Sequence, residues 1–244
     1  MSFEITDRIT KPTLARITGA VYLLFIATSV LADALGHIGL GDAQQVHDSL
    51  TTDAGTFRLA LVTAFASTFF FLLAAWGLFV LLRTVNLELA LLFLLLNAVG
   101  VAIQGASLLE LVAAMQVTGP GSGLATAEAH SLALAAINVY RAGFVAAQLF
   151  FGTWLFPLGY LVIRSGILPR LLGVLLLLDG VGELVWFLQA FLLPAYPAIK
   201  TPGTVVSLLA EVGLALWLLV RGVQDNPVGT SPSSARTGTG STRR

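Results

Sequence analysis

Six long runs of apolar residues follow one another along the chain, separated by short polar stretches. A helix needs roughly 20 residues to cross the ~30 Å hydrocarbon core of a bilayer. Runs of about that length lie at residues 17–35, 58–82, 87–112, 141–163, 171–193 and 203–221. None alternates apolar and polar positions with period two, as the strands of a membrane barrel do. The pattern predicts an all-α integral membrane protein, a helical bundle of six transmembrane helices.

The composition of the chain fits this class. Of 244 residues, 57% are hydrophobic and only 11% are charged, whereas about a quarter are charged in ordinary soluble domains. Basic and acidic residues both number 13, so no net charge attracts nucleic acid. The chain has no cysteine, which excludes disulfides and thiolate chemistry. We expect membrane lipid and an unidentified small-molecule ligand as partners, no nucleic acid and no cofactor, and a homo-oligomer is compatible with the sequence.

Basic residues divide unequally between the two sides of the predicted bundle. Three of them fall on one side: Arg58, Arg141 and Lys200. Ten fall on the other: Arg8, Lys11, Arg16, Arg83, Arg164, Arg170, Arg221, Arg236, Arg243 and Arg244. The positive-inside rule then places both termini in the cytoplasm. The chain divides into a cytoplasmic segment at 1–16, a six-span transmembrane domain at 17–222 and a cytoplasmic tail at 223–244, whose Ser, Thr and Gly content predicts disorder.

The first apolar run has an alternative interpretation as a secretory leader cleaved after Ala34. We treat it as a span, because its apolar stretch is longer than a usual leader core and "RITGAVYLL" parallels "RLLGVLLLL" at the start of the fifth run. A second parallel joins "LLLNAVG" at 94–100 to "LLLDGVG" at 176–182. It is either a weak internal repeat or a coincidence between Leu-rich helices, and both remain open. The polar, Gly-rich segments 36–56 and 116–130 are predicted to be loops outside the membrane.

Polar side chains within the apolar runs form a column rather than a scatter. At 1.5 Å per residue, Asp179 and Asn97 lie about 12 Å from the predicted cytoplasmic end, and Glu183 and Glu211 lie about 18 Å from it. Asp179 and Glu183 are four residues apart and share one helix face. The whole predicted intramembrane polar core consists of Asp179, Glu183, Glu211, Arg141, Arg58, Glu110, Gln148, Asn97 and Gln104.

Charges at mid-bilayer cost about 3 kcal/mol or more, so these carboxyls should face the bundle interior. There they would either pair with Arg141 or Arg58, reaching down from the far boundary, or carry a proton. Two functions remain open at this stage. One is a polar network that merely joins helices, and the other is a binding or transport-like component, linked to protons, for a small molecule.

The histidines offer an alternative in a different class. His37, His47 and His130, with Asp33, all fall on the predicted outer side and have the ligand types of a catalytic zinc site. Such a site would make the protein a membrane-embedded lipid hydrolase. The three lack a tight metal spacing such as H-E-x-x-H, so loop histidines without a metal are the favoured interpretation. No catalytic residue is identified, and a protein that is not an enzyme is preferred.

Small residues mark one helix for close packing. Gly152 and Gly159 flank Pro157 in the fourth run, where we expect a kink and a close helix neighbour. Gly77 is expected to be less critical. Tyr22 is interpreted as a packing residue.

The stretch "FFGTWLFPLGYLVIRSGILPRLLGVLLLLDGVGEL" at 150–184, with "RITGAVYLLFIATS" and "FRLALV" earlier, resembles a bacterial membrane-protein family known as domain of unknown function 4386. The resemblance implies a multi-span protein of the bacterial cytoplasmic membrane. It brings no catalytic or ligand-binding residues with it.

Overall fold

The computed structural model describes residues 10–223, and within this range all regular structure is helical. In chain order the elements are α1 (Lys11–Gly36), α2 (Ala43–Thr52), α3 (Ala54–Leu82), α4 (Leu87–Thr118), α5 (Thr126–Ser165), α6 (Arg170–Leu192), the 3-10 helix η2 (Pro197–Lys200) and α7 (Thr201–Val220). Six of them are long and apolar enough to cross a membrane. The predicted all-α, six-span bundle is therefore confirmed. The tail predicted to be disordered lies outside the described residues.

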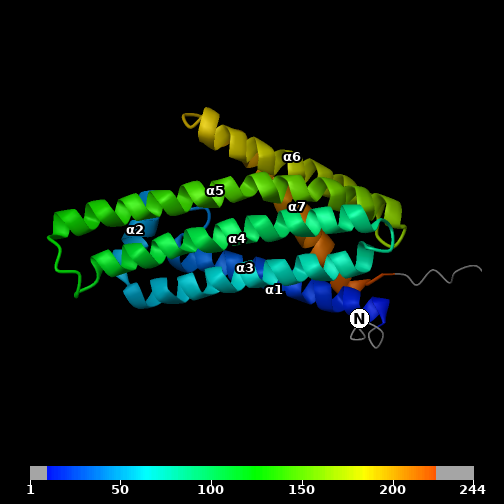
Figure 1. The fold of residues 1–244 in the computed structure, drawn as a ribbon, viewed down its shortest axis with the longest axis horizontal. Helices are drawn as coiled ribbons and strands as arrows, with labels where there is room; N and C mark the ends of the chain where they lie inside the picture. The colour runs from blue at the N-terminus through cyan, green and yellow to red at the C-terminus, as the bar shows by residue number, and fades with distance from the viewer. Residues whose placement is uncertain (1–9, 224–244) are drawn as a thin grey trace, which may run out of the picture.

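The long helices pack as neighbours in a bundle, in which the first helix contacts the last. α1 packs against α3 and α7, α4 against α3 and α5, and α6 against α5 and α7. The start of α1 and the end of α7 lie at one end of the bundle, and α2 lies at the opposite end (Figure 1). α6 follows α5 near the terminal end and diverges from it toward the α2 end (Figure 1).

The segment 36–56, predicted to be a loop, contains a helix. Asp42 begins α2 with a capping box: its side chain accepts a hydrogen bond from the backbone N–H of Gln45 at 2.9 Å, and Gln45 Oε1 accepts one from the backbone N–H of Asp42 at 2.8 Å. Val46 and Leu50 of α2 are buried. Asp53 then begins α3, and hydrogen bonds from Thr56 lower the pKa of its carboxyl from the usual value of 3.8. Two caps in succession explain why α2 and α3 follow with one residue between them.

Two helices extend farthest beyond the predicted spans. α4 continues to Thr118 rather than 112, and α5 begins at Thr126 rather than 141. At 1.5 Å per residue, α5 is ~60 Å long, twice the thickness of a bilayer core. α5 also continues through Pro157 as one helix. The excess length lies at the α2 end, where α2, residues 112–118 and residues 126–140 form a unit that we name the head.

Glycines set the helix crossings. A Cβ atom at Gly152 would lie 3.0 Å from the carbonyl oxygen of Gly180, and one at Gly159 would lie 2.8 Å from that of Gly173. The expected close neighbour of the α5 glycines is therefore α6. A Cβ atom at Gly77 would clash with the side chain of Thr18 on α1. We expected Gly77, unlike Gly152, to lie away from a close helix contact. This expectation is wrong, because Gly77 also lies at a contact between two helices.

Two apolar clusters divide the interior. One, near the terminal end, includes Tyr22, Phe71 and Trp154. The other, toward the head, includes Val46 of α2 and Tyr140 of α5. Side chains from both clusters line the same cavity, so the cavity lies where they meet.

Candidate functional site: a cavity with buried carboxyls

A cavity of about 460 Å³ lies inside the bundle, and we name it the carboxyl cavity. Residues of α1, α3, α4, α5, α6 and α7 line it, together with the turn after α1. Its polar side chains are Ser29, Asp33, Ser67, Gln104, Tyr140, Gln148, Glu183, Thr204, Ser207 and Glu211. The volume falls in the range of about 300 to 1,000 Å³ that ligand pockets occupy. All six spans thus contribute to one cavity, whose mostly apolar wall carries several polar side chains.

Two of the predicted core carboxyls line this cavity, and the third lies behind them. Glu183 and Glu211 are lining residues. Asp179, one turn from Glu183 on α6, is only 1% exposed and is not part of the lining. Glu211 interacts electrostatically with both Asp179 and Glu183. The structure therefore brings together on α6 and α7 the three carboxyls that the sequence placed at similar depth.

These carboxyls have few partners. Tyr22 of α1, which is fully buried, donates a hydrogen bond from its hydroxyl to Glu211 Oε1 at 3.3 Å. Three of their oxygen atoms are buried and have no hydrogen-bond partner among the described residues. These atoms are Asp179 Oδ1, Asp179 Oδ2 and Glu183 Oε2. Ser207 of α7 lies beside both of these carboxyls. Unpaired buried carboxyls are costly, so their presence calls for a functional explanation.

The predicted amides separate into two groups. Gln104 of α4 and Gln148 of α5 line the carboxyl cavity. Gln148 is buried, and its Nε2 donates to the carbonyl oxygen of Phe144 at 3.4 Å. Asn97 is fully buried, but it does not line the cavity, and neither polar atom of its side chain has a hydrogen-bond partner. Asn97 was predicted at the same depth as Asp179, but its side chain does not line the cavity.

The arginines do not pair with the carboxyls as predicted. Within residues 10–223, the one ion pair under 4 Å joins His47 and Asp48. Arg58 and Arg141 are exposed, because both lie near the α2 end, where water solvates a guanidinium better than the bundle interior does. Arg141 lines a second cavity of about 400 Å³ between α5, α6 and η2, together with Lys200. Arg58 and Glu110 line neither of these cavities.

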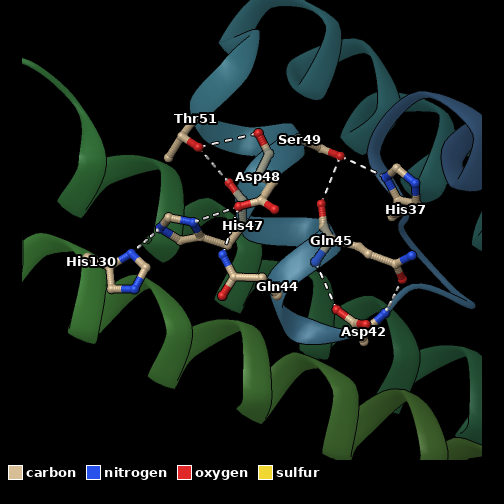
Figure 2. A network of polar contacts seen from close by, with 9 residues as sticks. All are labelled: His37, Asp42, Gln44, Gln45, His47, Asp48, Ser49, Thr51 and His130. Atoms are coloured by element: carbon tan, nitrogen blue, oxygen red, sulfur yellow. Dashed lines mark hydrogen bonds and ion pairs between the residues drawn. The ribbon is translucent and has the colours of Figure 1, made fainter.

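The histidines of the head meet only in part. His130 Nδ1 lies 3.1 Å from His47 Nε2, and the two rings are in edge contact (Figure 2). His37 instead bonds through Nδ1 to Ser49 Oγ at 2.8 Å, and it lies on the other side of α2 (Figure 2). Asp33 Oδ1 accepts a hydrogen bond from the backbone N–H of Leu40 at 3.0 Å. In the described part of the chain no three His, Asp or Glu side chains gather as metal ligands, so this arrangement does not favour a hydrolase with a three-histidine zinc site.

Sequence reasoning missed three contributors to the site. Tyr22, interpreted as packing alone, holds Glu211. Lys200, noted only for its charge, has its Nζ 4.6 Å from the ring centroid of Trp186 at the boundary between the two cavities. Ser207 was not singled out. The spacing of Ser207 and Glu211, four residues apart on one helix face, was a signal that could have indicated Ser207.

The six spans and the cavity between them define a polytopic integral membrane protein with an interior site. The chain belongs to the family described as Domain of unknown function (DUF4386), which matches residues 17–222. It is also similar to an uncharacterized protein of Archaeoglobus fulgidus, with 30% identity over 89 residues, which cover 34% of this chain and 49% of the relative. The match thus spans about half the length of that curated relative. No solved structure matches.

Proposed function

We propose that this protein binds a small molecule in the carboxyl cavity and couples that binding, or passage of the molecule through the membrane, to protons. The observation that carries the proposal is the gathering of Asp179, Glu183 and Glu211 on two neighbouring helices, with no ion-pair partner among the residues that the structure describes. In an apolar interior the negative charge of such a carboxyl is neutralised either by a bound proton or by a bound ligand. A network that only joins helices would satisfy its polar atoms. In the described part of the chain, both oxygens of Asp179 and one oxygen of Glu183 have no hydrogen-bond partner.

The proton affinity of these carboxyls depends on the neighbouring charged groups and on one tyrosine. Asp179 and Glu183 belong to α6, Glu211 to α7, and Tyr22 to α1. Lys200 of η2 acts electrostatically on Glu183. Uptake of one proton therefore depends on the charge of the neighbouring carboxyls, so the three titrate as a coupled set.

A hydrophobic carbodiimide tests the protonation step. Dicyclohexylcarbodiimide partitions into apolar sites, where a protonated carboxyl adds across one of its C=N bonds and rearranges to a stable N-acylurea. We expect peptide mass spectrometry to find the adduct on Glu183 or Glu211, and its yield to fall as the pH rises from about 5 to about 9, because only the protonated form reacts. The Glu183→Gln, Glu211→Gln double variant is the matched control. Absence of any adduct on α6 or α7 across this range would overturn the proton-linked part of the proposal.

We further propose that the protein resides in a bacterial cytoplasmic membrane with both termini in the cytoplasm. The division of basic residues, ten on one side and three on the other, supports this orientation. The absence of native cysteine makes it simple to test. We expect an impermeant maleimide to label Ser122→Cys on spheroplasts, and Arg83→Cys only after the membrane is permeabilised. The reverse pattern would invert the orientation and place the head in the cytoplasm.

A further inference from the structure

The charged residues that line the carboxyl cavity are all acidic. Asp33, Glu183 and Glu211 contribute three carboxyls, and among residues 10–223 no lysine, arginine or histidine lines the cavity. The basic side chains nearby, Arg141 and Lys200, line the second cavity instead. The electrostatic character of the carboxyl cavity therefore favours a positively charged occupant.

Aromatic rings form much of the remaining wall. They are Phe25, Phe71, Tyr140, Phe144, Phe151, Trp154 and Trp186. The faces of such rings attract cations, most strongly where water is excluded. Lys200 already places its ammonium group 4.6 Å from the ring centroid of Trp186 at the boundary of the cavity. The wall thus combines apolar surface with the two features that recognise an organic cation, namely ring faces and carboxyls.

The exposed lining residues mark the mouth of the cavity. Only four of its lining residues are exposed, namely Val30, Leu40, Thr204 and Leu208. They come from α1, from the turn after it and from α7. Val30 is 60% exposed and Leu208 59%, and both lie within the apolar spans, about 10 Å from the α2 end of their helices. A molecule that uses this mouth arrives from the bilayer, between α1 and α7.

We propose that the ligand is a lipophilic organic cation, an apolar body bearing a permanent or protonated positive centre, which reaches the carboxyl cavity from the lipid through the mouth between α1 and α7. This inference deepens the proposed function and rests on it. The positive centre lies between Glu183 and Glu211, and the apolar body lies against the rings of α1, α3 and α5. Glu183 and Glu211 both line the cavity, so their carboxyls are the acceptors that such a centre would meet.

Two ions of the same shape and opposite charge test the ligand class. Tetraphenylphosphonium is a permanent lipophilic cation, and tetraphenylborate is its anionic counterpart. We expect equilibrium dialysis at one fixed pH, with protein-free micelles as background, to show saturable binding of the cation and none of the anion. Equal binding of both ions, or binding of neither, would overturn the inference.

Variants separate the carboxyls from the apolar wall. Glu183→Gln and Glu211→Gln should each weaken binding of tetraphenylphosphonium by about tenfold, since each removes one attractive charge. Lys200→Met should strengthen it by about threefold, because the lysine repels a cation held at Glu183. Binding is compared only among variants whose thermal unfolding shows that they are folded. The lysine variant removes no group from the carboxyl cavity, so it still tests the inference if a glutamate variant does not fold. Unchanged affinity in the folded variants would contradict the proposed site.

A bulky residue at the mouth tests the route. Val30 is exposed, so Val30→Trp should leave the fold intact and slow tetraphenylphosphonium binding in lipid nanodiscs, whereas Leu24→Trp, also exposed on α1 but outside the cavity lining, should not. Equal rates for the two variants would exclude this mouth. If carbodiimide labels the glutamates but no cation binds, the ligand class fails and the proposed function stands. If the cation binds but no adduct forms, the proton-linked function fails instead.

Discussion

Replacing Gly19 by alanine is expected to lower the free energy of unfolding by about 1 to 3 kcal/mol, as overpacking does in well-packed interiors. A Cβ atom at this position would lie 2.5 Å from the backbone nitrogen of Leu219 and 2.7 Å from the carbonyl oxygen of Ala215. Both are backbone atoms of the last helix and its end, so α7 as a whole must shift. Because α1 and α7 close the bundle, the loss should appear as a lower thermal unfolding temperature in detergent.

Gly105→Ala is the matched control for this variant. Gly105 is also inside a membrane-spanning helix, and a Cβ atom there would meet nothing within 4 Å. Alanine should therefore be neutral or stabilising at Gly105, by up to about 1 kcal/mol from helix propensity. If the two variants unfold at the same temperature, the close contact of α1 with α7 is not a determinant of stability.

Replacing Asp179 by valine is expected to raise the free energy of unfolding by about 1 to 3 kcal/mol and to impair cation binding. The side chain is 1% exposed and neither carboxyl oxygen has a hydrogen-bond partner, so an apolar side chain of similar volume removes an unfavourable burial. The same change removes one of the three interacting carboxyls that the proposed function uses. Thermal unfolding and tetraphenylphosphonium binding, measured on the same preparation, separate the two effects.

The adjacent residue supplies the comparison. Leu178→Val makes a small apolar change on an exposed face of the same helix and should alter neither stability nor binding by more than about 0.5 kcal/mol. A lower unfolding temperature for Asp179→Val would mean that the carboxyl supports the fold, and would contradict the idea that this residue serves function at the expense of stability.

The six helices could be predicted because lipid imposes length and apolarity on every span. Helix ends were predicted less well at the α2 end, where the bilayer no longer sets them. The 112–118 and 126–140 stretches are helical because they pack in the head, with Ile137 and Tyr140 buried there. The pattern Asp42-Ala-Gln-Gln45 is a capping-box signal for α2, but the glycines just before it favoured a loop.

Partners across helices could not be derived from depth alone. Spacing correctly placed Asp179 and Glu183 on one face, and Gly152 and Gly159 at a close contact. It did not give the rotation of neighbouring helices, which decides that Asn97 turns away from the cavity while Tyr22 reaches Glu211. The predicted arginine partners failed for a related reason. Both arginines are close enough to the end of the bundle to remain solvated, so burial offered them no gain.

α5 has a mechanical consequence beyond its role in the wall of the cavity. It runs as one helix from the terminal end of the bundle into the head, where His130 contacts His47 of α2. The start of α5 in the head and the α5 residues in the cavity wall are thus parts of one continuous helix. An antibody fragment bound across α2 and the start of α5 would therefore be connected through this helix to one wall of the cavity.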